Sequence, residues 1–284
     1  MGRLTKSSSK AKPKLPWDLD SFIQATNYRS AFSIKDLDRF LEALTKKATS
    51  LTRDPERALT SPNIRRMVRL ALYQHVIYCD DSSSMADNDR FTIAQSFIMS
   101  IAGLATRAHP DERSGVEVRF INSNATLSGR GEQLRAGLER IRPSGGNRLG
   151  TGLRTKVLQP FVFDVIKNGG QLKRPLLVSV IIDYAPDSEK RTAFRDVIGG
   201  CKKSLDRAGF PSTSALFMVT IIGDDVDARR YARELRGDST VEDVLYCTTE
   251  GLRNKQDKLG SSDRNLEDWL LTSLMAPIQR VEGA

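Results

Sequence analysis

The fold is decided by the stretch Val76-Ile77-Tyr78-Cys79-Asp80-Asp81-Ser82-Ser83-Ser84-Met85, in which an apolar run meets a cluster of short oxygen-bearing side chains. The apolar half has the length and composition of a strand that is buried on both faces of a sheet. The polar half is rich in acids and hydroxyls. Oxygens gathered in such a loop bind a hard divalent cation, but they also form turns and cap helices. Which of these interpretations is favoured depends on the rest of the sequence.

The composition indicates a soluble globular protein. The chain has 284 residues, of which 39% are hydrophobic and 28% charged, enough to bury a large core. No apolar run is long enough to span a bilayer, and the first residues lack the apolar segment of a secretion signal. The cysteines are odd in number and lie in apolar patterns, as buried reduced thiols do. We therefore expect a cytoplasmic or nuclear protein with no membrane partner.

The net charge of +9 is concentrated at the start of the chain. Residues 1–15 contribute five cations and no acid, which leaves only +4 for the rest. Residues 1–16 are predicted to form a disordered basic tail, because they are also rich in Ser, Ala and Pro. Such a tail could serve nuclear import or bind nucleic acid. The sequence favours a solubilising tail, and nucleic acid is not the expected partner.

The chain divides into residues 17–72, where apolar residues have helical spacing, and residues 73–284, where strand and helix patterns alternate. The first region is expected to form a helical appendage, with one helix capped by Ser33 and another opened by Ser61 and Pro62. In the second region we expect strands at residues 76–79, 116–120, 125–127, 176–182, 215–222 and 241–247. Helices are expected around residues 89–105, 134–141, 153–165, 194–205, 226–235 and 266–274. This order predicts an α/β, doubly wound, Rossmann-like fold with a mostly parallel sheet of about six strands and helices on both faces.

Acidic residues follow three of the expected strands, namely Asp80, Asp183 and Asp224. In an open α/β sheet, the ligand binds outside the carboxyl ends of the strands. Asp80, Ser82 and Ser84 alternate along their loop, so their side chains can point the same way. Together with Asp183 they would form a partial shell for Mg²⁺ or Mn²⁺, completed by water. Asp224 is more simply interpreted as the start of a helix.

Each of these features also has a purely structural interpretation. The loop from Asp80 to Ser84 could be a strand-end turn in which Ser84 or Asp87 caps the next helix. Asp183 could form an ion pair with a nearby Arg or Lys. The combination of this loop with Asp183 and with the Gly-rich segment 145–152 favours the metal site.

The motif Asp80-x-Ser82-x-Ser84-Met85 resembles the metal-ion-dependent adhesion site (MIDAS) of von Willebrand factor type A (vWA, integrin I-like) domains. The segment 145–152 is similar to the second metal loop of that family, and the strand that ends at Asp183 is similar to the strand before its third loop. The resemblance covers about residues 73–280 and is greatest to intracellular members from fungi. It implies a vWA-like domain over residues 73–284.

Two of the implied metal loops depart from the family pattern. The family usually has Thr where this chain has Asn147, whose amide oxygen can also bind a hard cation, and Thr151 is a second candidate in the same loop. The third loop has Tyr184 after Asp183, where the family usually has Gly. The ligand set implied by the resemblance is Asp80, Ser82, Ser84, Asn147, Thr151 and Asp183.

The resemblance implies a binding module, in which the metal keeps one open position for an Asp or Glu of a partner protein. The alternative is an enzyme, a magnesium-dependent phosphohydrolase or phosphotransferase with Asp80 as its nucleophile. Ser82 stands where the acid/base of such an enzyme would be, and no Lys follows the strands as a phosphate clamp. The segment 145–152 lacks both the Lys of a P-loop and the third Gly of a dinucleotide fingerprint, so no nucleotide is expected.

Overall fold

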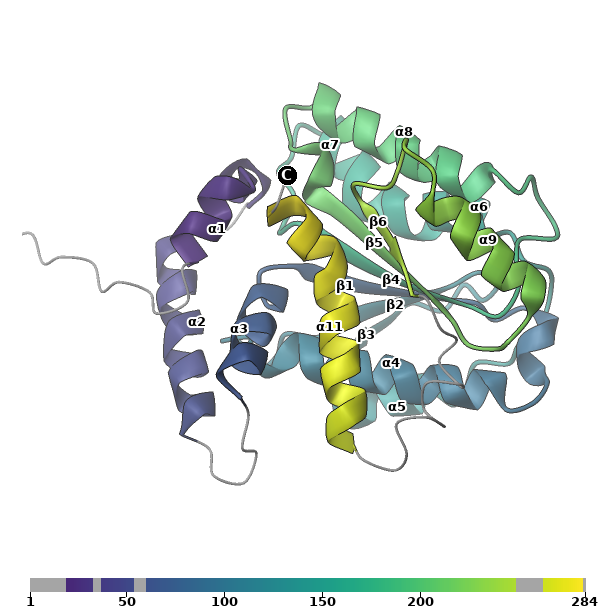
Figure 1. Cartoon of the computed structure of the whole chain (residues 1–284), viewed down its shortest axis with the longest axis horizontal. Helices are drawn as coiled ribbons and strands as arrows, with labels where there is room; N and C mark the ends of the chain where they lie inside the picture. Colours follow the sequence, from purple (N-terminus) through teal and green to yellow (C-terminus); the bar gives the residue numbers. More distant parts are fainter. Residues whose placement is uncertain (1–18, 33–36, 54–59, 249–262, 283–284) are drawn as a thin grey trace, which may run out of the picture.

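The computed structural model describes residues 19–32, 37–53, 60–248 and 263–282 (Figure 1). These residues form an α/β fold with a six-stranded, mostly parallel sheet, helices on both faces and further helices before the first strand. The predicted fold class is therefore confirmed. The basic tail at residues 1–16 and the expected cap at Ser33 lie outside the described residues.

The sheet has the strand order β3-β2-β1-β4-β5-β6, with β3 antiparallel to β2 and every other neighbouring pair parallel. All side chains of β4 and β5 are buried, whereas those of β2 alternate between buried and half-buried, as the sequence predicts. The strands are β1 (Gln74–Cys79), β2 (Val116–Phe120), β3 (Leu127–Gly129), β4 (Leu176–Ile182), β5 (Ala215–Ile221) and β6 (Leu245–Cys247).

Two expected strands differ from the observed ones. The edge strand β3 lies two residues later than expected, and β6 contains only the last three residues of the expected 241–247. Val241 and Val244 are buried, but they lie in a turn. Burial alone gave that segment the apolar pattern of a strand.

Helices cover both faces of the sheet (Figure 1). In that view α8 and α9 lie above the sheet, whereas α4 and α5 lie below it. The helix expected at residues 153–165 is longer and continues through Pro160, because the segment η3 around that proline is π-helical. The helices are α4 (Arg90–Arg107), α5 (Gly131–Leu138), α6 (Leu149–Gly152), η3 (Leu153–Phe163), α7 (Asp164–Lys167), α8 (Ala193–Arg207), α9 (Val226–Arg236) and α11 (Asp263–Glu282), with the short turns η2 (Ser83–Ala86) and η4 (Ser212–Ser214).

The helices before β1 pack on the same hydrophobic core as the sheet, since one buried cluster extends from Leu19 to Val281. Two polar contacts reinforce this packing: the hydroxyl of Tyr28 donates to the carbonyl of Thr213 at 2.7 Å, and Arg69 pairs with Glu282 at 2.7 Å. The four elements are α1 (Leu19–Ala25), η1 (Tyr28–Ala31), α2 (Leu37–Thr52) and α3 (Ser61–Leu70). Thr60 caps α3, one residue before the expected start at Ser61.

The chain reverses its direction of travel across the sheet between β1 and β4. From β1 it crosses through α4 to β2 on one side, and from β4 it crosses through α8 to β5 on the other. The carboxyl ends of β1 and β4 therefore form a topological switch point, because the connections that follow them run in opposite directions. Open α/β sheets bind their ligands at such a point. Asp80 and Asp183 directly follow these two strands.

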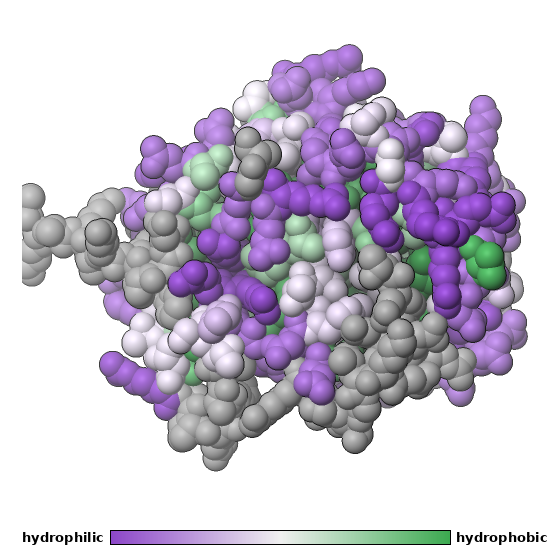
Figure 2. Space-filling view, viewed as in Figure 1, coloured by the Kyte–Doolittle hydropathy of each residue, from purple (hydrophilic) through white to green (hydrophobic). Residues whose placement is uncertain are grey.

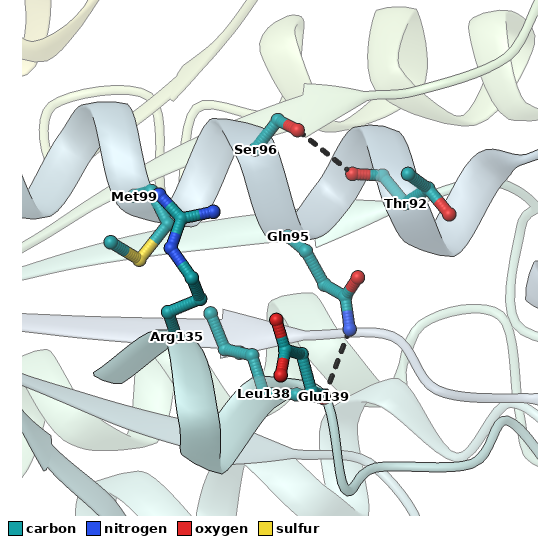
Figure 3. Close-up of a pocket in the computed structure, with 7 residues that line it drawn as sticks. All are labelled: Thr92, Gln95, Ser96, Met99, Arg135, Leu138 and Glu139. Atoms are coloured by element: carbon teal, nitrogen blue, oxygen red, sulfur yellow. Dashed lines mark hydrogen bonds between the residues drawn. The ribbon is translucent and has the colours of Figure 1, made fainter. Parts of the chain in front are cut away.

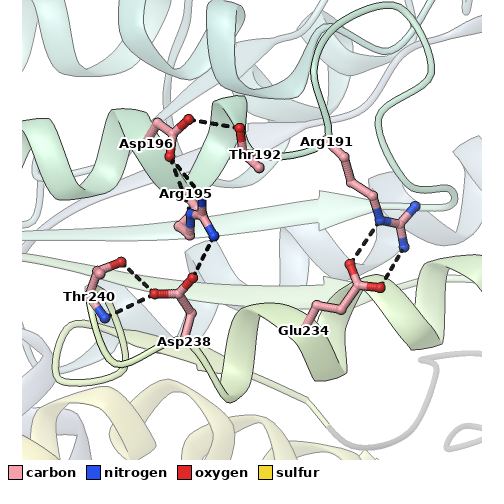
Figure 4. Close-up of polar contacts among 7 residues, drawn as sticks. All are labelled: Arg191, Thr192, Arg195, Asp196, Glu234, Asp238 and Thr240. Carbon is pink, nitrogen blue, oxygen red and sulfur yellow. Dashed lines mark hydrogen bonds and ion pairs between the residues drawn. The ribbon is translucent and has the colours of Figure 1, made fainter.

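Ion pairs tie the start of α8 and the residues before it to α9 and the residues after it (Figure 4). Arg191 pairs with Glu234 at 2.8 Å, and Arg195 pairs with Asp238 at 2.8 Å. Each partner is partly exposed, so each pair contributes little to stability by itself. Their effect is to neutralise the cations on this side of α8.

The surface in Figure 2 is mostly hydrophilic, with apolar area only in small separate patches. Among the described residues, Val226 is the one large hydrophobic side chain that is largely exposed. In the same part of the chain, no helix combines the length and apolar character that a membrane span requires. The cysteines Cys79, Cys201 and Cys247 are buried free thiols, as expected.

Candidate functional site

Asp80 and Asp183 lie side by side at the switch point. The amide of Asp80 donates to the carbonyl of Ile181 on the adjacent strand at 2.8 Å, which fixes the two strand ends against each other. Both side chains are buried, and burial raises the pKa of each carboxyl. The negative charge of Asp183 raises the pKa of Asp80 further. Two buried acids this close to each other need a cation or a proton.

Ser82 and Ser84 project toward each other from the loop after β1. Their hydroxyl oxygens are 3.1 Å apart, and the amide of Ser82 donates to Oδ1 of Asp80 at 2.8 Å. Ser83, between them, turns away and donates its hydroxyl to the carbonyl of Gly145 at 3.2 Å. The two hydroxyls are therefore close together, as the sequence predicts, but not through an extended loop, because residues 83–86 form the 3-10 turn η2.

Asn147 reaches the same point from the Gly-rich loop. Its Nδ2 donates to Oδ2 of Asp80 at 2.9 Å, and its backbone amide donates to Oδ1 of Asp187 at 3.0 Å. The loop turns at Gly145, where φ is +85°, a conformation that favours glycine. A Cβ at Gly146 would lie 2.2 Å from the hydroxyl of Ser188, so this loop passes close to that side chain.

Thr151 is engaged elsewhere. Its hydroxyl donates to Oε2 of Glu189 at 2.7 Å, and its side chain is exposed, not directed at Asp80. The neighbouring glycines serve packing: a Cβ at Gly150 would lie 2.5 Å from the backbone of α8, and one at Gly152 would lie 2.0 Å from the hydroxyl of Tyr78. Of the six expected ligands, the structure brings together Asp80, Ser82, Ser84, Asn147 and Asp183.

Arg90 is a member of the site that the sequence analysis missed. From the first turn of α4, its Nη1 donates to Oδ2 of Asp183 at 3.3 Å and to the carbonyl of Ser84 at 3.1 Å. Its guanidinium lies over the ring of Tyr184, with Cζ 5.0 Å from the centroid. The ion-pair interpretation of Asp183 therefore also holds in this structure. The signal was a basic residue six positions after the last serine of the motif, but only the packing of α4 shows where its head group goes.

Asp81 and Lys156 shape the edge of the site without facing it. The carboxylate of Asp81 accepts from the backbone amides of Asn122 and Ser123 at 2.7 and 2.8 Å. The ammonium of Lys156 donates to three consecutive carbonyls, those of residues 121–123, at 2.9 to 3.0 Å. These contacts hold the loop after β2 beside the oxygen cluster, which assigns a structural role to the second acid of the motif.

The residues present fit a hard divalent cation. Two buried oxygens in the cluster, Oδ1 of Asn147 and Oδ1 of Asp183, have no hydrogen-bond partner among the described residues, which is costly unless something else binds them. The described residues contain no group of three or more His, Cys, Asp and Glu that could hold a metal, so a zinc-type site is not formed there. A set of hydroxyl, carboxylate and amide oxygens instead suits Mg²⁺ or Mn²⁺ with several waters.

A separate hollow of about 300 Å³ lies between α4 and α5 (Figure 3). Gln95 spans it by donating to the carbonyl of Leu138 at 2.9 Å. Its lining contains one cation, Arg135, and one acid, Glu139, over the apolar side chains of Met99 and Leu138. This mixture selects no particular charge, and none of its residues belongs to the oxygen cluster.

No protein-family model matches the chain, and no curated protein matches it either. The function is therefore inferred from the residues and the geometry of the site.

Proposed function

We propose that this protein is a metal-ion-dependent binding module. Its site is a MIDAS-type centre of the kind found in vWA domains, formed by Asp80, Ser82, Ser84 and Asp183 with the amide oxygen of Asn147. The cation is Mg²⁺ or Mn²⁺. An Asp or Glu of a partner protein completes the coordination.

The observation that carries this proposal is the pair of buried, unpartnered oxygens on Asn147 and Asp183. They come from different loops and lie in the cluster that holds Asp80 and the two serine hydroxyls. A buried acceptor without a donor costs about 1–3 kcal/mol, and a bound cation would remove this cost at both oxygens. Their position at the switch point is a second support, because ligands of open α/β sheets bind there.

Binding is favoured over catalysis by the state of Asp80. Both of its carboxylate oxygens accept hydrogen bonds, one from the amide of Ser82 and the other from the side chain of Asn147. With both oxygens held by these donors, the carboxylate is poorly placed to attack an incoming phosphoryl group. Neutral serine hydroxyls as ligands would leave the cation electron-poor, so it would attract an external carboxylate.

The proposal is tested by titrating the full chain with Mg²⁺ and Mn²⁺ while the unfolding temperature is recorded. Binding to the folded state adds about 2.7 kcal/mol of stability at a hundred times the Kd, which raises the unfolding temperature by several degrees. Asp183→Ala should abolish this rise. Asp224→Ala, an exposed acid at the end of the next strand, is the matched control and should keep it.

The partner is tested with a fluorescein-labelled Asp-containing peptide, with and without EDTA. Binding that is lost both in EDTA and in Ser82→Ala supports the proposal, whereas binding indifferent to both removes the metal from the mechanism. Metal-dependent turnover of an aryl phosphate that disappears in Asp80→Asn would support the enzyme alternative instead.

A further inference from the structure

A basic groove lies on the face of the sheet that α8 covers, between α8 and the helical segment formed by η3 and α7. It has a volume of about 490 Å³ and adjoins a second hollow of about 530 Å³ that shares Ile166, Ser204 and Arg207 with it. Four cationic side chains line the groove: Arg154 and Lys167 from one side, and Lys203 and Arg207 from the other. Among the described residues, no Asp or Glu is part of its lining.

The two sides of α8 differ in how their cations are used. Toward α9, Arg191 and Arg195 pair with acids, as Figure 4 shows, and Lys202 pairs with Asp243. The next residue, Lys203, faces the groove and forms no ion pair with any described residue, and the same is true of the other three groove cations. The unpaired cluster therefore attracts anions.

The floor of the groove is apolar. Phe163 and Ile166 are half-buried against the hydrophobic core, and Phe210 continues this floor into the second hollow. The guanidinium of Arg154 lies over the ring of Phe163, with Cζ 5.3 Å from the centroid. This stacking positions the cation at the rim and leaves its N–H groups available to a ligand.

We propose that the basic groove binds an acidic, amphipathic segment of a partner protein. The carboxylates of the segment pair with the four cations, and its aliphatic side chains pack on Phe163 and Ile166. Clustered Arg and Lys side chains recognise acidic motifs in this way, and complementary charge sets the specificity and the rate of association. Nucleic acid fits less well, because its phosphates leave an apolar floor unused and because Arg154 already covers the face of Phe163 on which a base would stack.

The groove is independent of the candidate metal centre. α8 follows the carboxyl end of β4 and ends before the amino end of β5, so Arg207 lies toward the opposite end of the strands from Asp183. The same holds for Lys167, which precedes the start of β4. Binding in the groove should therefore not respond to EDTA.

The test uses the full chain and fluorescence anisotropy with three labelled probes: a 16-residue helical peptide with Glu and Leu on opposite faces, a 16-residue poly-Glu peptide and a 16-nucleotide single-stranded DNA. We expect the Glu/Leu peptide to bind most tightly and to weaken with salt. Lys203→Glu with Arg207→Glu should reduce its affinity about tenfold or more, because two attractive charges become repulsive. The control is Arg65→Glu with Arg140→Glu, which makes the same change in net charge at exposed residues outside the groove and should change the affinity less than twofold.

A second pair of variants tests whether the peptide binds in the groove itself or only responds to the net charge of the protein. A Cβ at Gly200 or at Gly199 would meet nothing within 4 Å, but only Gly200 lines the groove. Gly200→Trp should block the peptide, whereas Gly199→Trp should not. Equal affinity for all three probes, tighter binding of the DNA, or a peptide affinity that none of the groove variants changes would each overturn the proposal.

Discussion

Nη1 of Arg90 lies 3.3 Å from Oδ2 of Asp183, so the cluster of oxygens at the switch point contains a cation supplied by the protein itself. The side chain of Asp183 is fully buried and that of Arg90 is 15% exposed, so the pair is only weakly screened by solvent. The other oxygen of Asp183 has no hydrogen-bond partner in the part of the chain that the structure describes. Arg90 thus provides a hydrogen bond to one of the two carboxylate oxygens of Asp183. In the proposed function, it competes with the metal for that carboxylate.

Replacing Arg90 with Gln should have opposite effects on metal binding and on stability. In EDTA the variant should lose about 3 kcal/mol of unfolding free energy, because Asp183 keeps a buried charge without its partner. The affinity for Mg²⁺ should rise, since the competing cation is gone. Urea unfolding in EDTA and calorimetric titration with Mg²⁺ measure the two effects. Arg140→Gln, at an exposed residue without an ion pair to described residues, is the control, and a lower Mg²⁺ affinity in Arg90→Gln would contradict the competition.

Gly150→Ala should destabilise the fold by about 1–3 kcal/mol, because the added methyl group would lie 2.5 Å from the backbone of Ala193 and Phe194 and neither segment can yield easily. Gly200→Ala is the matched substitution inside α8, where the new methyl group meets nothing within 4 Å. It should stabilise by up to about 1 kcal/mol through helix propensity. Urea midpoints of the two variants test this difference in sign. Equal effects would mean that α6 and α8 are not in close backbone contact.

His75 should make the protein less stable in mild acid. Burial lowers its pKa from 6.5 to about 4, and its Nε2 lies 2.8 Å from the carbonyl of Leu70. Between these two values the unfolded chain binds the proton and the folded chain does not, so stability falls as the pH drops from about 6.5 towards 4. At pH 5 the loss due to His75 is about 2 kcal/mol relative to pH 7.5.

The variant His75→Gln keeps a donor for the Leu70 carbonyl but does not titrate. Its unfolding free energy should therefore change less between pH 7.5 and pH 5 than that of the unaltered chain, by the same 2 kcal/mol or so. If the unfolding free energies of the two proteins changed equally with pH, His75 would titrate in the folded state as it does in the unfolded chain, which would contradict the prediction.

The strands that the sequence predicts best are the ones whose burial leaves a simple pattern. The run 176–182 is apolar except for Ser179 because β4 lies in the middle of the sheet, and its bounds are those expected. At the edges the pattern is weaker: β3 is displaced, and the valines of the turn before β6 are buried for packing and not for pairing. The sequence predicts a helix through Pro160, and a π-helical segment accommodates the proline there.

In the candidate site, too, the sequence predicted what depends on neighbouring residues but not the contacts between residues far apart in the chain. The spacing predicted that Ser82 and Ser84 would face the same way, and their hydroxyls are 3.1 Å apart, but they meet through the 3-10 turn η2 and not through an extended loop. The partner of Thr151 could not be predicted, because Glu189 lies 38 residues further along the chain. Arg90 was missed for a similar reason: its position depends on how α4 packs at the switch point.

The central claim is that one divalent cation binds between Asp80, Ser84 and Asp183. A crystal structure grown with Mn²⁺ tests it directly through the anomalous scattering of the metal. We expect a peak within coordinating distance of the Ser82 and Ser84 hydroxyls and beside Asp183, with the Arg90 guanidinium displaced from that carboxylate. An ordered cluster without such a peak, in which Arg90 keeps its contact with Asp183, would contradict the proposed function.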